Sequence, residues 1–160
     1  MTKAGTIAPV VVCDLMKRNI KEDGPSKEEL KIADFGCGTG LVGEKLVSLG
    51  FKNITGLDMC EAMMEKAKDK KIYHELRLFI MGKGALPEDL KGKFDVALAA
   101  AVFIPGHAPP EGFDDMLESL KEGGLAVMSC SLKDWSKGEY SEGMKLREAK
   151  GLWKLEEELD

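Results

Sequence analysis

The sequence predicts a doubly wound α/β fold with a mostly parallel sheet, and three observations lead to this prediction. Apolar runs of strand length alternate along the chain with segments of helical periodicity, which implies right-handed crossovers between parallel strands. A glycine-rich stretch follows the first strand-like run, where a strand should pass into a helix. The 160 residues suffice for one domain with a real core, and no repeat or low-complexity tract interrupts them.

Each predicted element has its own signal. Residues 8–21 carry apolar side chains at helical spacing, with Pro9 well placed in a first turn. A polar stretch leads from this helix to the first strand, and Gly50 ends the helix that the glycine-rich stretch opens. The remaining helices are expected at residues 41–49, 60–70, 112–121 and 140–149, and the strands at residues 31–35, 53–58, 76–81, 94–101, 124–132 and 152–159.

Composition and charge exclude several classes of partner. The net charge is −5, and the densest lysine cluster, at residues 66–71, is diluted by acids, so we expect no nucleic-acid partner. No apolar run approaches the roughly 18 residues that span a bilayer, and no signal-peptide pattern opens the chain, so we expect no membrane partner. The 4 cysteines are far apart without a Cys-x-x-Cys pair, which predicts a reducing, cytoplasmic setting without a metal site.

The stretch IADFGCGTGLVG, residues 32–43, is the strongest functional signal. Ligands of doubly wound sheets sit beyond the carboxyl ends of the strands, where this loop falls. A dinucleotide fingerprint would need its third glycine at position 41, which is Leu41, and the acid Asp34 before the loop would repel a pyrophosphate. A ligand with a cationic ammonium and sulfonium, such as S-adenosylmethionine, would be attracted instead.

A second acid, Asp58, ends the second strand 22 residues after Gly36 (58 − 36). At this place a carboxylate can accept both hydroxyls of an adenosine ribose. The alternative is that Asp58 caps the helix beginning near Cys60. Because it occurs together with the glycine-rich loop, we expect Asp58 to contact a ligand.

Four motifs carry a family resemblance: DFGCGTG, GLD at the second strand, FDVALAAA at the fourth and LKEGGLAVMS into the fifth. With them, residues 30–135 resemble the class I S-adenosylmethionine-dependent methyltransferases, which have a Rossmann-like fold. The later stretches PGHAPPEGFDDML and KGEYSEGMKLREAKGLWKLEEEL are similar to the methyltransferase-like subfamily of the Williams–Beuren syndrome critical region. The resemblance implies methyl transfer from S-adenosylmethionine, and we expect a small-molecule acceptor.

The resemblance also implies roles for residues at each strand end. Asp34 would hold the methionine part of the cofactor, directly or through water, while Asp58 would bind the ribose and Met59 would pack on the adenine. The backbone against the methionine part would be that of Gly36, Cys37, Gly38 and Gly40. The adenine edge would be bordered by Gly82 and Lys83, and the sulfonium side by Ala99, Ala100 and Ala101. Lys83 stands where many relatives carry an acid.

Methyl transfer needs in-line approach, desolvation and, for a protonated nucleophile, a base. His107 lies on the loop IPGHAPPEG, which we expect at the active edge, and an imidazole suits proton removal near neutrality. The alternative is a loop histidine bonded to turn backbone. His74, at the end of a helix, is expected to have no chemical role.

Both ends of the chain depart from the family pattern. Relatives carry a closing segment where only residues 1–6 stand here, and a seventh strand would begin near residue 160. We therefore expect a single domain, residues 1–160, truncated at both ends and lacking the last strand of seven. The unpaired strand at residues 152–159 would be open to self-association. Two other functions stay open: a non-catalytic domain that binds S-adenosylmethionine or a protein partner, and an NAD-dependent oxidoreductase.

Overall fold

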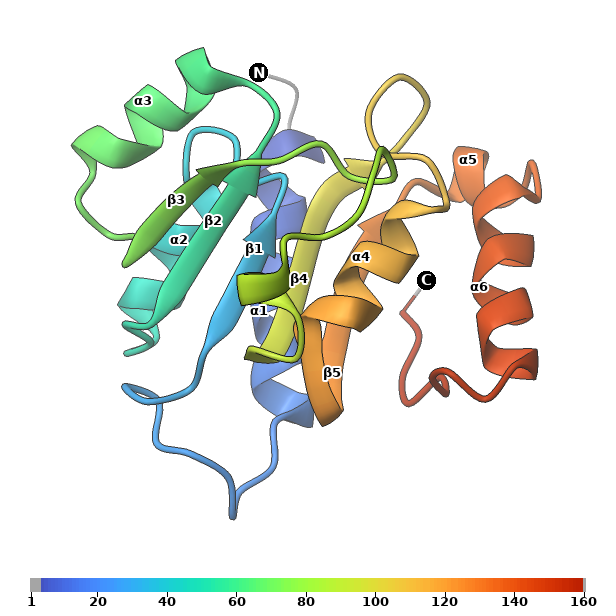
Figure 1. The fold of residues 1–160 in the computed structure, drawn as a ribbon, viewed down its shortest axis with the longest axis horizontal. Coiled ribbons are helices and arrows are strands. Elements are labelled where there is room, and N and C mark those ends of the chain that lie inside the picture. The colour runs from blue at the N-terminus through green and yellow to red at the C-terminus, as the bar shows by residue number, and fades with distance from the viewer. Residues whose placement is uncertain (1–3, 160) are drawn as a thin grey trace.

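A five-stranded parallel sheet forms the centre of the molecule, with helices on both of its faces (Figure 1). The computed structural model describes residues 4–159. The strands lie in the order β3-β2-β1-β4-β5, and each neighbouring pair is parallel, which confirms the predicted Rossmann-like fold class. The strands are β1 (Ile32–Phe35), β2 (Ile54–Asp58), β3 (Glu75–Leu78), β4 (Phe94–Phe103) and β5 (Leu120–Cys130). The helices are α1 (Ala4–Asn19), α2 (Leu41–Ser48), α3 (Glu61–Asp69), the short 3₁₀ helix η1 (Glu88–Leu90), α4 (Gly112–Ser119), α5 (Leu132–Trp135) and α6 (Glu139–Ala149).

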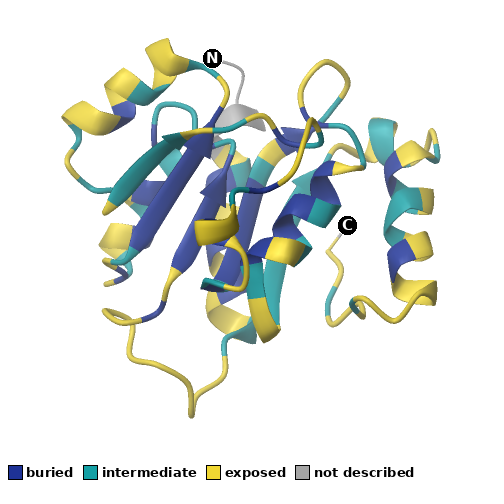
Figure 2. Cartoon of the chain, viewed as in Figure 1, coloured by how far each residue is buried: buried dark blue, intermediate teal, exposed yellow. Residues whose placement is uncertain are grey.

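The central strand β1 divides the core into two layers. Successive side chains of a strand point to opposite faces of a sheet. Phe35 lies in the cluster on the α4 face, whereas Ile32 belongs to the cluster that α1 and α2 cover. Asp34 therefore points to the same face as Ile32, and its register partner on β2 is Gly56. The buried strands appear as the dark blue centre of Figure 2, while α3 is largely exposed.

Several element boundaries differ from the predicted ones. The first helix begins at Ala4, so Pro9 lies in its second turn and not in its first. β3 ends at Leu78, before the predicted residue 81, and the N–H of the next residue, Phe79, still donates to the carbonyl oxygen of Asp58 on β2 at 2.9 Å. Among the described residues, no helix has both the length and the apolar character that crossing a membrane requires.

The predicted strand at residues 152–159 is wrong. This segment forms no strand and lies between α4 and α6 (Figure 1). The Trp153 ring packs edge-on against Phe113 of α4, with ring centroids 5.5 Å apart, and its Nε1–H donates to the Met144 carbonyl oxygen of α6 at 3.1 Å. Aromatic packing and a helix carbonyl therefore hold the segment in place of strand pairing, and β5 is the edge of the described sheet.

Candidate functional site

The glycine-rich loop, residues 36–40, joins β1 to α2 at the side of the sheet where the parallel strands end (Figure 1). Gly36, Gly38 and Gly40 have φ angles of 69°, 54° and 91°, which residues with a Cβ rarely adopt. A Cβ at Gly36 would also collide with the side chain of Val102. The loop therefore needs its glycines for its own conformation and packing, whatever binds to it.

Hydrogen bonds fasten this loop to the end of β2. The N–H groups of Gly36 and Cys37 donate to the same β2 carbonyl oxygen, at 2.7 and 3.1 Å, and that of Gly38 donates to Asp58 Oδ2 at 2.8 Å. Asp58 Oδ1 accepts from the N–H of Cys60, just before α3, also at 2.8 Å. The structure thus shows the local capping role of Asp58. Each carboxylate oxygen still has a second lone pair for a ligand, so ribose binding stays a prediction.

Asp34 lies at the end of β1 with its carboxylate fully buried. Its Oδ2 accepts a hydrogen bond from the Tyr73 hydroxyl at 2.7 Å, whereas its Oδ1 is buried without a partner in the described part of the chain. Burial raises the pKa of the Asp34 carboxyl to about 7, the Tyr73 hydrogen bond opposes the rise, and the charge of Asp58 adds to it. A buried acceptor without a donor is costly and rare, and it marks a place where a ligand could supply the donor.

Tyr73 was not singled out by the sequence, although it is the residue in contact with the buried acid. It stands between α3 and β3, 39 residues from Asp34, so only the tertiary fold brings the two together. The available signal was a pair of glycines outside the loop. Gly43 lies inside α2 and Gly56 inside β2, where glycine weakens a helix or strand unless something packs closely against it.

Cys37 points beneath the loop. Its sulfur would lie 3.0 Å from a Cβ at Gly56, in the space that the Tyr73 ring shares. Burial is the largest effect on its thiol and raises the pKa, so the thiol is neutral near physiological pH. The side chain of Cys37 therefore packs against β2, and a contact of its backbone with a cofactor stays a prediction.

The residues predicted at the adenine occupy the ends of β2 and β3. Met59 is 58% exposed directly after Asp58, and Lys83 is exposed after β3. Gly82 has a φ of 71°, and a Cβ there would lie 2.5 Å from the ring of Pro109. The turn after β3 is thus packed against the loop that follows β4.

A buried acid that the sequence did not single out holds this turn. Asp115 of α4 accepts a hydrogen bond from the N–H of Gly82 through Oδ2 at 2.6 Å. Burial raises the pKa of the Asp115 carboxyl to about 6, against the effect of that N–H, and the charges of Glu118 and Asp114 add to the rise. Asp115 is a structural link between α4 and the end of β3.

The three alanines predicted at the sulfonium side lie toward the end of β4, next to β1 in the sheet. Ala99 is buried, Ala100 is partly buried and Ala101 is exposed. Ala101 has a φ of 56°, an uncommon conformation for a residue other than glycine, and its N–H donates to Ser129 Oγ of β5 at 2.8 Å. Such backbone strain concentrates at functional sites.

The two histidines lie at opposite ends of the sheet. His107 is exposed on the loop after β4, on the side of the glycine-rich loop, and its backbone N–H donates to the carbonyl oxygen of Ile104 at 3.1 Å. His74 is exposed just before β3, and its backbone N–H donates to the carbonyl oxygen of Ile54 at 2.8 Å. Of the two, His107 is the histidine near the carboxyl ends of the strands, where the predicted site lies.

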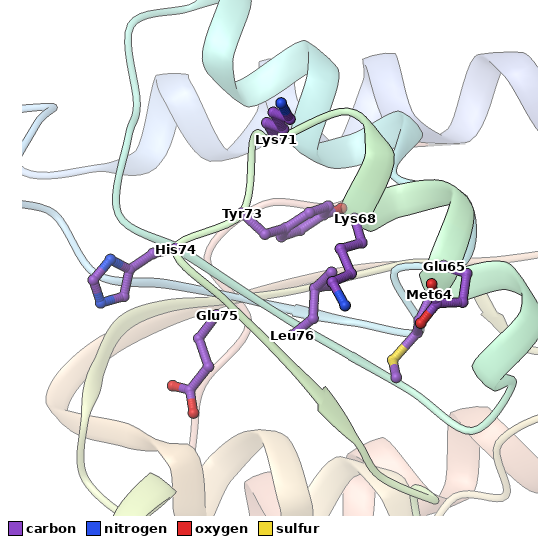
Figure 3. Close-up of a pocket in the computed structure, with 8 residues that line it drawn as sticks. All are labelled: Met64, Glu65, Lys68, Lys71, Tyr73, His74, Glu75 and Leu76. Atoms are coloured by element: carbon purple, nitrogen blue, oxygen red, sulfur yellow. The ribbon is translucent and has the colours of Figure 1, made fainter.

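A pocket of about 340 Å³ lies between α3 and β3 (Figure 3). Met64, Tyr73 and Leu76 contribute its apolar wall, and charged side chains of α3 and β3 surround it. This pocket is not at the carboxyl ends of the strands. Tyr73 links this pocket to the predicted site, because it lines the pocket and also contacts Asp34.

The fold thus brings together the glycine-rich loop and both acids, at two adjacent strand ends. The alanines of β4 flank β1 on one side, and Gly82 and Lys83 follow the strand beyond β2 on the other. The site combines the buried carboxyl of Asp34 with the carboxylate of Asp58, two groups that suit a ligand with cationic groups and hydroxyls.

Comparison with known proteins gives matches over most of the chain. A family model described as a methyltransferase domain matches residues 32–124. Human Methyltransferase-like protein 27 is 30% identical over 150 residues, which are 91% of this chain and 59% of that protein. Ribosomal protein L11 methyltransferase from Cellvibrio japonicus is 26% identical over 110 residues, which are 68% of this chain and 31% of that protein. The chain therefore spans 59% of the length of the first relative and 31% of the length of the second.

Solved structures share the fold. A TehB-like SAM-dependent methyltransferase from Corynebacterium glutamicum has a TM-score of 0.64 at 19% identity, over 87% of this chain and 71% of that one. An S-adenosylmethionine dependent methyltransferase from Mesorhizobium loti has a TM-score of 0.54 at 22% identity, over 74% of this chain and 50% of that one. Identities this low establish a common fold and leave function to the site.

Proposed function

The chain belongs to the methyltransferase domain family, and from this premise we propose that it transfers the methyl group of S-adenosylmethionine to a small molecule. The family and the shared fold imply S-adenosylmethionine as the cofactor. When bound, it supplies an activated methyl group on a cationic sulfonium. The activity and the acceptor class are our proposals.

The observation that carries the proposal is the unpaired Oδ1 of Asp34. The ammonium group of the cofactor is a donor that matches this acceptor, and a positive charge nearby would favour the ionised carboxylate. A pyrophosphate would bring negative charge and no donor. Because Asp34 has no exposed surface, the ammonium reaches Oδ1 only if the loop opens, and otherwise the carboxylate acts through its charge.

The helix that follows the glycine-rich loop, and not the loop itself, offers backbone N–H groups for the carboxylate of the cofactor. The N–H groups of Gly36, Cys37, Gly38 and Gly40 already donate within the chain. The first-turn N–H groups of α2, which begins at Leu41, have no acceptor within the helix. We therefore propose that this turn binds the carboxylate of the cofactor, with the positive end of the helix dipole behind it.

The remaining site residues keep their predicted roles within the proposal. Asp58 is held between the loop and α3, so its orientation is set before a ribose arrives. Met59 offers an exposed apolar side chain for adenine packing. His107 is the proposed proton acceptor, because its loop lies on the side of the sheet where the strands end.

We propose a small acceptor and not a nucleic acid because the net charge of −5 opposes a polyphosphate backbone. Self-association through a sheet edge also stays a proposal. Its place is now β5, because residues 152–159 form no strand.

The experiment is label transfer from radioactive S-adenosylmethionine into fractionated metabolites. We expect label in a small-molecule fraction, loss of transfer in Asp58→Ala, and retention in the control Glu122→Ala, an exposed acid in the first residues of β5. Label in nucleic acid would overturn the acceptor class. Failure to transfer label to any fraction would overturn the proposed activity.

A further inference from the structure

Three glycines from three different segments surround one aromatic ring. A Cβ added at Gly40, Gly43 or Gly56 would lie 3.2, 2.6 or 2.9 Å from ring carbons of Tyr73. Distances under about 3 Å are not tolerated between carbon atoms, so a side chain at Gly43 or Gly56 would displace the ring. The loop, α2 and β2 therefore share a slot that fits Tyr73.

The slot delivers the Tyr73 hydroxyl to Asp34. The ring lines the pocket between α3 and β3 (Figure 3), while the hydroxyl donates to Asp34 Oδ2 at 2.7 Å. Within residues 4–159, this is the hydrogen bond that the carboxylate receives, and Oδ1 has none. The same phenol therefore sets the orientation of the carboxylate and decides which oxygen is left for another donor.

We propose that Tyr73 is a positioning residue of the cofactor site, which orients the Asp34 carboxylate and leaves its second oxygen for the ammonium group of the cofactor. The inference rests on the proposed function, and it assigns the slot of three glycines to this purpose. Tyr73 acts through Asp34 and is not itself placed against the cofactor.

The surroundings of Asp34 explain why one hydrogen bond matters. The ionisable groups around it are Cys13 of α1, Cys37 of the loop, Asp58 of β2 and Tyr73. These are thiols, an acid and a phenol. Burial and Asp58 raise the pKa of the Asp34 carboxyl, and only the Tyr73 hydrogen bond lowers it.

The lysine of α2, Lys45, pairs with an acid other than Asp34. Lys45 lies 4.0 Å from Asp14 of α1, and it acts on the Cys13 thiol. Loss of the Tyr73 hydroxyl would therefore leave Asp34 protonated to a higher pH, where a neutral carboxyl attracts an ammonium less.

The test compares Tyr73→Phe with Tyr140→Phe. Both side chains are tyrosines that donate to an oxygen of the chain, and Tyr140 donates to the Ala108 carbonyl oxygen at 3.0 Å, on the other face of the sheet. We expect Tyr73→Phe to bind S-adenosylhomocysteine about tenfold more weakly near pH 7, with the rise of affinity moved to higher pH by about one unit. Tyr140→Phe should keep the parent pH profile.

Two further measurements separate positioning from packing. 5′-Methylthioadenosine has the nucleoside without the ammonium, so it should bind parent and Tyr73→Phe alike at each pH. In carboxyl NMR of the free proteins, the titration midpoint of Asp34 should rise in Tyr73→Phe. Equal midpoints, or equal weakening of both ligands, would overturn the role of Tyr73. Failure of the unaltered chain to bind S-adenosylhomocysteine would instead overturn the proposed function, and the NMR midpoint would still test the control of Asp34 by Tyr73.

Discussion

Replacing Asp34 by Asn should stabilise the free protein, and the gain should grow as the pH rises through the acidic range. Burial raises the pKa of the Asp34 carboxyl to about 7 from its ordinary value of 3.8. Between these values the folded chain keeps a proton that the unfolded chain has released, so the free energy of unfolding falls as pH rises. A difference of about 3 pKa units corresponds to about 4 kcal/mol, lost between about pH 4 and about pH 7.

An Asn side chain does not titrate, so the free energy of unfolding of Asp34→Asn does not include this fall with pH. Urea denaturation of both proteins from about pH 4.5 to about pH 8 measures the difference, in which groups common to both cancel. The gap should widen up to about pH 7 and then stay constant. At the same time, affinity for S-adenosylmethionine should fall, because its ammonium loses a charged partner. Parallel stability curves would refute the raised pKa, and tighter donor binding by Asp34→Asn would refute the electrostatic role.

Three further changes test the site and its packing. Asp58→Ala should weaken S-adenosylhomocysteine binding about tenfold to a hundredfold in calorimetry, and it should cost the free protein about 1–3 kcal/mol because two backbone N–H groups lose their acceptor. Lost stability with unchanged affinity would limit Asp58 to capping. Gly43→Ala should destabilise the parent in urea denaturation, but it should stabilise a Tyr73→Ala variant by about 1 kcal/mol, because alanine favours the helix once the ring is gone. Equal effects in both backgrounds would contradict the close contact between Gly43 and the Tyr73 ring. Gly82→Ala should lower the melting temperature more than Gly84→Ala, because both have positive φ but only the Cβ at Gly82 meets a proline ring, so equal losses would leave backbone strain as the sole cause.

The location of the site could be predicted because its main features are local in the sequence. Asp34 and Asp58 each end an apolar run, and parallel strands bring such ends to one side of a sheet. The glycine-rich loop directly follows the strand that carries Asp34, so its place at the strand ends can be predicted, although its conformation cannot. The observed hydrogen bond from Gly38 to Asp58 joins two features that the sequence had already placed together. The ligand contacts of these residues stay predictions.

The parts that could not be predicted depend on contacts between distant segments. Tyr73 meets Asp34 only because α3 returns the chain beside β2, and nothing in its own neighbourhood marks it as buried against an acid. Asp115 looks like one of several acids in α4 until the fold sets it against Gly82. Residues 152–159 were expected to form the last strand, but Trp153 packs on α4 instead.

Titration calorimetry of the unaltered chain with S-adenosylmethionine, S-adenosylhomocysteine and NAD tests the central claim most directly. The account predicts measurable binding of the first two and weaker or no binding of NAD, because buried negative charge at Asp34 favours an ammonium and opposes a pyrophosphate. Repeating the titration with Asp34→Asn should weaken the first two ligands and not NAD. Binding of NAD in preference to both adenosyl ligands would contradict the account.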